Sequence, residues 1–272
     1  MTEPALSRRR LLGAAAAAVP AAIAGCAVPG PLETESGSRT LSLGDATSLT
    51  VENHNGRITV TGEDREDVRL DYEKRTRYGA DLLDRTDVVD QRVGETLQVA
   101  VEFERNGDPT PTVRLDLRVP ESTPVERLET GNGDVTARNV GGNPRLRTSN
   151  GDAVAREVGG YVSLDTSNGR VEATGIEGLD GAASSNGDVE VEIPALRQDA
   201  RVETSNGDVT AALATGLDAD VTAETSNGDV STAGLSFGDA ESGDSRFSGR
   251  LGEGGTDLRL STSNGDVTLS AL

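Results

Sequence analysis

The chain has 272 residues, of which 46 are acidic and 26 basic, so its formal net charge is −20 at pH 7. This balance argues against nucleic acid as a partner, because nucleic-acid binding needs a basic stripe and the sequence contains none. With one cysteine and one histidine, the sequence provides neither a disulfide framework nor a His/Cys metal cluster.

The N-terminal segment has the features of an export signal. The twin-arginine pair Arg8 and Arg9 precedes an Ala-rich apolar stretch, residues 11–24, which is too short to span a bilayer. The stretch ends in Ile-Ala-Gly-Cys, which resembles a lipoprotein box whose cysteine thiol accepts lipid. We therefore predict a signal peptide over residues 1–25 and lipidation at Cys26, which would anchor the exported protein to the outer face of the cytoplasmic membrane. The alternative is an ordinary signal peptide with a coincidental cysteine.

Residues 26–38 are rich in Pro, Gly and Ser and predict a flexible tether between the membrane and the folded domain. The remaining composition, acidic and poor in aromatic residues, is typical of salt-adapted proteins, because molar salt screens self-repulsion of this size. A twin-arginine lipoprotein of this composition resembles those exported by haloarchaea. An acidic protein from an ordinary bacterium is the alternative.

Residues 39–128 are rich in predicted strands but lack the repeat that follows them. An Asn55-Gly56 pair predicts one tight turn. Short runs with alternating apolar residues predict strands at 49–51, 58–60, 97–101 and 113–119. We expect this region to be the atypical cap that a repeat array needs at its end. Residues 78–90 favour a short helix or a loop.

From residue 129 the chain repeats the motif Thr-Ser-Asn-Gly-Asp-Val. Its asparagines are separated by 18, 18, 18, 20, 21 and 37 residues, and they are Asn132, Asn150, Asn168, Asn186, Asn206, Asn227 and Asn264. A period near 20 predicts stacked copies of one supersecondary unit. Alternating strands flank each Asn-Gly turn, so residues 129–272 predict an all-β solenoid with 18–21 residues per coil. The 37-residue gap predicts a degenerate coil that turns near Gly249.

These residues resemble a known family. Val51–Val60, Leu115–Pro120 and the Thr-Ser-Asn-Gly-Asp-Val series are similar to the putative-adhesin, β-strand-repeat domain of unknown function found in bacterial and archaeal envelope proteins. The resemblance covers residues 41–272. It implies a right-handed β-solenoid at the cell surface, and it transfers no catalytic residues because the family has none established.

One group of side chains is a candidate cation site. An aspartate follows most Asn-Gly turns, and the set is Asp134, Asp152, Asp188, Asp208, Asp229 and Asp266. If the coils stack in register, these carboxylates form a column that could bind Ca²⁺, the only cofactor that the sequence suggests. The alternative is that each Asp hydrogen-bonds the backbone of its own turn. Arg170 interrupts the column, and the nonapeptide pattern of Ca²⁺-binding β-rolls is absent.

Catalytic signals are weak. His54, the one histidine, lies beside a turn, and no Gly-Lys-Ser/Thr phosphate loop occurs. Tyr72, Tyr78 and Tyr161 are too few to build the aromatic subsites of a glycan-cleaving enzyme. The Thr/Ser pair before each Asn predicts a hydroxyl ladder that supports stacking.

We therefore expect a non-catalytic, surface-anchored structural or adhesin-like module. Its expected partners are the membrane, through the lipid anchor, and cell-envelope polymers or other surface proteins. A Ca²⁺- or glycan-binding module that uses the Asp, Thr and Ser ladders is the alternative. A polysaccharide-degrading enzyme is a third hypothesis, and it requires a convergent carboxylate cleft.

Overall fold

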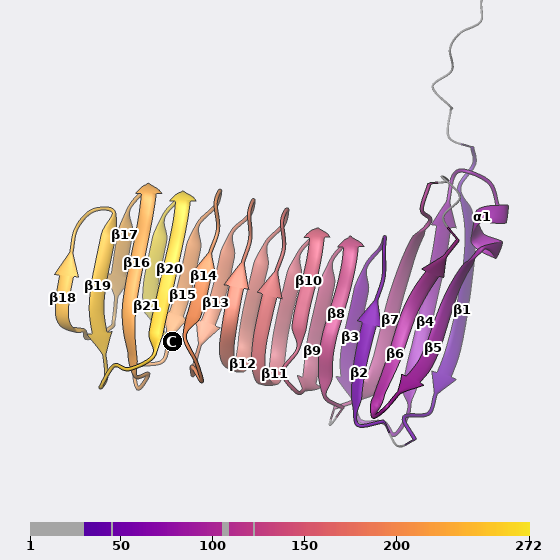
Figure 1. The fold of residues 1–272 in the computed structure, drawn as a ribbon, viewed down its shortest axis with the longest axis horizontal. Coiled ribbons are helices and arrows are strands. Elements are labelled where there is room, and N and C mark those ends of the chain that lie inside the picture. Colours follow the sequence, from indigo (N-terminus) through magenta and orange to yellow (C-terminus); the bar gives the residue numbers. More distant parts are fainter. Residues whose placement is uncertain (1–29, 45, 105–108, 122) are drawn as a thin grey trace, which may run out of the picture.

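The computed structural model describes residues 30–44, 46–104, 109–121 and 123–272. The predicted signal peptide and Cys26 lie outside these residues. The described protein is almost entirely β-structure: its strands join into one open sheet that winds into an elongated, two-layered stack (Figure 1). The only helix in this part of the chain is α1 (Asp81–Asp84), and no described helix has the length and hydropathy needed to cross a membrane.

The front layer of Figure 1 contains the strands that precede the Asn-Gly turns, continued by further strands at both ends. Neighbours are parallel from β6 to β16 and antiparallel beyond them. From the N-terminal end of the stack, the order is β5 (Thr86–Val93), β6 (Thr96–Phe103), β2 (Ser48–Glu52), β8 (Val125–Asn132), β10 (Arg145–Asn150), residues 161–165 of β11 (Ala153–Asp165), residues 178–183 of β12 (Val171–Ala183), β14 (Ala200–Glu203), β20 (Asp257–Asn264), β16 (Ala219–Asn227), β19 (Arg246–Leu251) and β18 (Gly238–Ser242).

The back layer contains the strands that follow the Asn-Gly turns. Its neighbours are parallel from β7 to β17, and β1 and β4 are antiparallel. In the same direction the order is β1 (Glu33–Leu41), β4 (Val68–Thr76), β7 (Thr112–Pro120), β3 (Ile58–Glu63), β9 (Val135–Gly141), residues 153–159 of β11, residues 171–176 of β12, β13 (Val189–Ile193), β15 (Val209–Leu213), β21 (Val267–Ala271) and β17 (Val230–Ala233). Two strands and two turns per coil confirm the predicted β-solenoid.

Apolar side chains fill the space between the layers. Val135, Ala153 and Val171 occupy equivalent positions in three successive coils, and none has exposed surface. Leu128 and Leu146 form the matching column in the front layer. Since successive side chains of a strand point to opposite faces, the polar residues between these positions face solvent. The alternation in the sequence therefore predicted the inner face correctly.

The last coil of the sequence is not the last coil of the stack. β20 lies between β14 and β16, and β21 lies between β15 and β17. Residues 257–271 therefore insert between the coils formed by residues 200–213 and 219–233. The prediction of a degenerate coil near Gly249 is wrong, because Gly249 lies in β19, which pairs antiparallel with β16 and β18. The 37-residue gap between Asn227 and Asn264 contains this hairpin and the segment that leads from it back to β20.

The N-terminal end has the same arrangement. β2 lies between β6 and β8, and β3 lies between β7 and β9, so residues 48–63 form a coil inserted out of chain order. Asn55 aligns in parallel with Asn132, so the stack of Asn-Gly turns begins inside the region that the sequence predicted to be a cap. The tether is also shorter than predicted, because β1 already includes residues 33–38.

The β18–β19 hairpin closes the far end of the stack. Phe247 is buried there. The backbone carbonyl oxygens of Asp244 and Ser245 accept hydrogen bonds from the amides of Val230 (2.7 Å) and Thr225 (3.0 Å). These carbonyls replace the partners that a further coil would supply.

Candidate functional site

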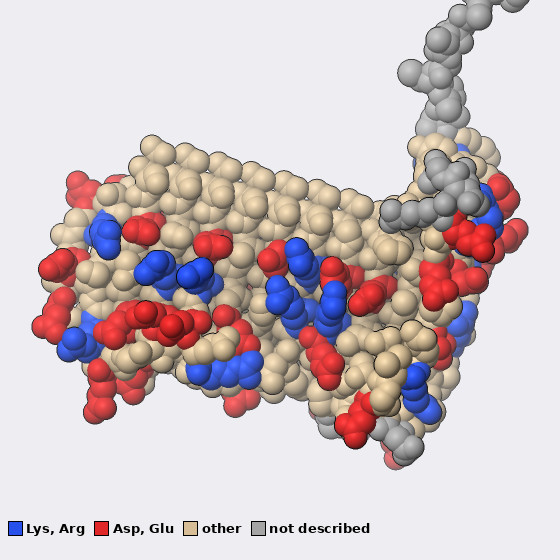
Figure 2. Space-filling model, viewed as in Figure 1, with Lys and Arg blue, Asp and Glu red and all other residues tan. Residues whose placement is uncertain are grey.

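The repeated motif residues form columns along one edge of the stack, where β8, β10, β16 and β20 end in Figure 1. The part of this edge that Figure 2 shows consists of regular, uncharged rows, and charged side chains gather on the face below it.

The first column consists of a buried Thr or Ser hydroxyl two residues before each Asn. Each hydroxyl donates to the Gly carbonyl of a neighbouring coil at 2.8–3.0 Å, in the pairs Thr130–Gly56, Thr148–Gly133, Thr166–Gly151, Ser184–Gly169, Thr204–Gly187, Thr225–Gly265 and Thr262–Gly207. The second residue of each predicted Thr/Ser pair is exposed. Only the first residue of each pair therefore supports the stacking.

The second column is a ladder of asparagine side chains. Each Nδ2 donates to the Oδ1 of the neighbouring coil at 2.9–3.1 Å, in the order Asn150–Asn132, Asn168–Asn150, Asn186–Asn168, Asn206–Asn186, Asn264–Asn206 and Asn227–Asn264. Such amide ladders stabilise in-register stacks. The following Gly is required: Gly151 has φ +146°, and a Cβ there would lie 2.3 Å from the carbonyl oxygen of Gly133.

The third column contains the predicted aspartates. The structure brings all six into one line, which also includes Arg57 and Arg170. Five of these carboxylates accept a hydrogen bond at 2.8–3.2 Å from the backbone amide at the same position of a neighbouring coil, in the pairs Asp134–Asp152, Asp152–Arg170, Asp188–Asp208, Asp208–Asp266 and Asp266–Asp229. The expectation that each Asp bonds its own turn is therefore wrong, because the partner amide lies on another coil.

Basic residues reduce the negative charge of this column. Arg57 begins it and forms an ion pair with Asp134 at 2.7 Å, and Arg170 occupies its fourth position. Among the described residues, no three His, Cys, Asp or Glu side chains gather in a way that could hold a metal ion. His54 is exposed, and its backbone amide donates to Asn53 Oδ1, in agreement with the predicted turn position.

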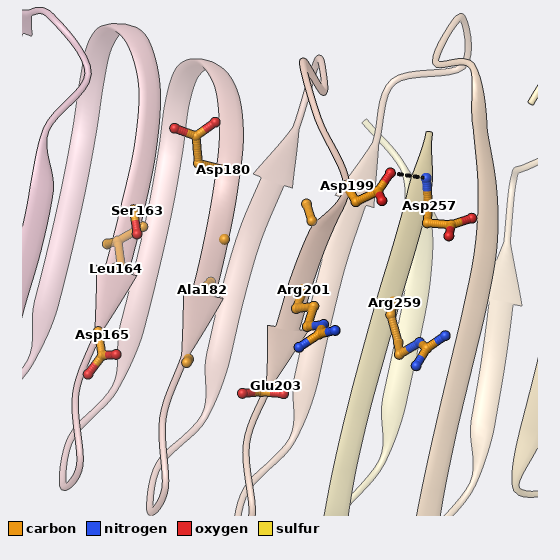
Figure 3. Close-up of a pocket in the computed structure, with 13 residues that line it drawn as sticks. Ser163, Leu164, Asp165, Asp180, Ala182, Asp199, Arg201, Glu203, Asp257 and Arg259 are labelled. Atoms are coloured by element: carbon orange, nitrogen blue, oxygen red, sulfur yellow. Dashed lines mark hydrogen bonds between the residues drawn. The ribbon is translucent and has the colours of Figure 1, made fainter. Parts of the chain in front are cut away.

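A groove of about 400 Å³ lies on the outer side of the front layer, across β11, β12, β14 and β20 (Figure 3). The outward positions of β12 are Gly181 and Ala183, which carry almost no side chain. Ala183 lies between Asp165 on one neighbouring strand and Glu203 on the other. The groove therefore exists because small residues on one strand are flanked by larger residues.

Arg201 and Arg259 form the basic part of this groove. They are directly opposite each other on β14 and β20, and both side chains are exposed. Neither guanidinium has a hydrogen-bond or ion-pair partner in the described part of the chain. Arg127 of the front layer differs in this respect: it hydrogen-bonds Glu129, which raises the pKa of that guanidinium above its ordinary value.

Carboxylates flank the arginine pair on both sides. Figure 3 shows Asp199 and Asp257 on one side and Asp165 and Glu203 on the other. Asp199 Oδ1 accepts the backbone amide of Asp257 at 3.1 Å.

A fifth carboxylate of the groove, Asp180, already has an arginine partner. It hydrogen-bonds Arg197 at 2.8 Å, and this bond is the main cause of a raised pKa for that guanidinium. Arg197 also lies over the ring of Tyr161, 4.7 Å from its centroid.

This groove was not among the sites expected from the sequence. One signal was present: both arginines stand five residues before an Asn of the repeated motif, at Asn206 and Asn264. An alignment of the repeats would have matched them. Their opposed positions depend on the insertion of β20 beside β14, which cannot be read from the order of the chain.

Comparison with known proteins gives a consistent result for the fold. The family model described as Toastrack DUF4097 matches residues 116–270. A putative adhesin from Bacteroides fragilis is 11% identical, with 88% of this chain and 97% of that chain covered and a TM-score of 0.50. At this identity the likeness concerns the fold alone.

Two further solved structures are similar at lower scores. A putative cell adhesion protein from Clostridium sporogenes is 9% identical, covering 88% of this chain and 100% of its own, with a TM-score of 0.41. A putative lipid binding protein from Parabacteroides distasonis is 14% identical, covering 86% and 96%, with a TM-score of 0.38. No curated protein matches the sequence significantly.

Proposed function

The chain belongs to the Toastrack DUF4097 family, and on this premise we propose that it is a non-catalytic, lipid-anchored module that acts in structure or adhesion at the cell surface. The adhesin descriptions of its structural neighbours support the adhesive role, and none of the descriptions reported above names an enzyme. Twin-arginine export and the salt-adapted character of the protein are part of the same proposal.

The observation that carries the proposal is the use of the repeated motif. Its polar groups form the hydrogen bonds that join one coil to the next: hydroxyl to Gly carbonyl, amide to amide, and carboxylate to backbone amide. These bonds stabilise a regular stack, whereas a catalytic site requires side chains that are free to meet a substrate. The motif is therefore best explained as structural, and the outer faces of the layers are the surfaces that can meet a partner.

The position of the chain ends supports anchoring at one end. Gly30 lies at the β1 end of the stack, because its amide donates to the carbonyl oxygen of Arg77, the residue that follows β4. This end is opposite to β17 and β18 (Figure 1). Only four positions separate Gly30 from Cys26 in the sequence. A lipid at Cys26 would hold the β1 end close to the membrane, and the remaining coils would extend from it. One acyl chain binds membranes only marginally, so stable anchoring requires a second chain.

Cation binding by the Asp column is a second proposal with weaker support. One oxygen of each of five carboxylates already accepts a backbone amide, so a Ca²⁺ ion would have to use the other oxygens together with water.

Replacement of the lipid-acceptor cysteine tests the anchor. We predict that Cys26→Ser moves the protein from the membrane fraction to the soluble fraction of lysed cells, because no thiol remains to carry lipid. Immunoblots of both fractions after a high-salt wash measure the distribution.

Ala27→Ser is the matched control, since it introduces the same side chain one position later and leaves the thiol in place. This variant should stay in the membrane fraction. Retention of Cys26→Ser in the washed membranes would contradict the lipid-anchor proposal.

A further inference from the structure

The unpaired arginines in the front-layer groove call for a physical explanation. Arg201 and Arg259 lie directly opposite each other on neighbouring strands, and like charges in that position destabilise a sheet. In other opposed arginine pairs one member binds a carboxylate: Arg127, opposite Arg145, hydrogen-bonds Glu129. In the same way Arg156, opposite Arg138, hydrogen-bonds Glu172. Neither Arg201 nor Arg259 gains such a partner from the described residues, although this acidic molecule offers many carboxylates.

We infer that this groove binds an acidic polysaccharide, with a sugar carboxylate held between Arg201 and Arg259. Neighbouring strands are about 4.8 Å apart, so two guanidinium groups at opposed positions can approach one carboxylate together. Guanidinium groups are planar donors that match a carboxylate, and charge-assisted hydrogen bonds of this kind are the stronger class. The inference deepens the proposed adhesive function, on which it rests, by naming a ligand class.

The groups around the arginine pair favour a sugar over other anions. Asp165 and Glu203 lie on one side of the pair and Asp199 and Asp257 on the other (Figure 3). These carboxylates accept hydrogen bonds and repel negative charge. A suitable ligand therefore carries an anionic group in the middle and hydrogen-bond donors on both sides. A uronic acid within a glycan has this pattern, with one carboxylate and several hydroxyl groups.

Other polyanions fit less well. A nucleic acid or a densely sulfated chain would place further negative charges against the flanking carboxylates. An acidic peptide could donate its backbone N–H groups to the flanking carboxylates, but its further Asp and Glu side chains would be repelled by them. Repulsion from these residues therefore acts as selection against such partners.

The shape of the groove also suits a chain-like ligand. Gly181 and Ala183 form a shallow floor across β12, and the groove is open to solvent, so a polymer can pass through it. An added Cβ at Gly181 would meet only the carbonyl oxygen of Arg201, at 3.4 Å, so the floor is not required for packing. Larger side chains at these positions would fill the groove without removing a charge.

Binding assays with defined polymers test the inference. The full-length protein in detergent is titrated with hyaluronan, in which each uronic acid alternates with an uncharged sugar, with dextran as the neutral polymer and dextran sulfate as the sulfated one. We expect binding to hyaluronan only. The double variant Arg201→Gln/Arg259→Gln should bind at least about tenfold more weakly, a change typical of losing a charge-assisted hydrogen bond. Ala183→Gln, which partly fills the groove, should also weaken binding.

Arg145→Gln is the matched control. Arg145 occupies the same repeat position on β10, is exposed, has no side-chain partner among the described residues, and lies outside the groove. It should bind as the wild type does. The Arg201→Gln/Arg259→Gln variant should fold as the wild type does, because both side chains are exposed and neither forms an ion pair among the described residues. Circular dichroism checks this.

Several outcomes would overturn the inference. They are no binding of hyaluronan by wild type, equal binding by the double variant, equal weakening by Arg145→Gln, or a preference for dextran sulfate. None of them bears on the membrane anchor, which the fractionation of Cys26→Ser tests separately. Failure of the anchor with intact glycan binding would overturn the anchored location and leave the groove assignment unchanged.

Discussion

At the residue scale, one buried hydroxyl per coil decides whether a backbone carbonyl has a partner. Thr166 is 3% exposed, and its Oγ1 lies 2.8 Å from the carbonyl oxygen of Gly151. That oxygen has no other hydrogen-bond partner among the described residues. The next residue, Ser167, has an exposed side chain. Two adjacent hydroxyl residues therefore contribute very differently to stability.

Thr166→Val tests this difference. The valine keeps the shape of the side chain but leaves the part-buried Gly151 carbonyl without its donor, so the free energy of unfolding should fall by about 1–3 kcal/mol. Ser167→Ala, the control, should change it by less than about 0.5 kcal/mol. Urea denaturation of both variants at one salt concentration gives the comparison. Equal stability of the two variants would show that the hydroxyl column does not stabilise the stack.

The sequence could predict part of this residue-scale detail. Two-residue alternation from Leu146 places Thr148 on the inner side, so the division of the Thr/Ser pair into a buried and an exposed member was available from the pattern. The hydrogen-bond partners of the aspartates were not available. Asp152 bonds the amide of Arg170, a residue of the next coil, and a single repeat does not define how coils are aligned.

At the scale of whole elements, two coils lie in the stack out of chain order. They are the first coil, residues 48–63, and the last coil, residues 257–271. The sequence predicted coils of the right size but not their spatial order. The motif is nearly identical in each copy, so the pairing of β20 with β14 and with β16 is not encoded by distinct side chains. The loop lengths and the β18–β19 hairpin decide the order, and these segments carry no repeat signal.

Three substitutions of valine by aspartate test the inserted coil. Val267 lies near the chain end but inside the stack, and it is as fully buried as Val209. Val267→Asp and Val209→Asp should both destabilise the protein by about 4 kcal/mol or more, since each buries an unpaired charge. Val230→Asp should cost at most about half as much, because Val230 lies in the terminal strand β17 and is only partly buried. Thermal unfolding of the three variants gives the order of their stabilities.

Chain order alone gives the opposite expectation. If the coil of residues 257–271 ended the stack, Val267→Asp would be the mildest of the three variants. A higher unfolding temperature for Val267→Asp than for Val230→Asp would contradict the inserted arrangement.

At the scale of the whole molecule, the protein is an elongated stack whose repeated residues serve its own stability. The groove that we propose as a binding site lies on an outer face, where residues differ from coil to coil. The sequence predicted the all-β stack and its inner face because those depend on local alternation and turn residues. It did not predict the groove, because Gly181, Arg201 and Arg259 come together only through the order of the coils.

Display on the cell surface is the central claim of this account, and antibody labelling of intact cells tests it most directly. An antibody raised against the folded domain should label intact cells that produce the wild-type protein about as strongly as permeabilised cells. Cells that produce Cys26→Ser should lose the surface label and release the protein. Labelling of the wild type only after permeabilisation would place the protein inside the cell and contradict the account.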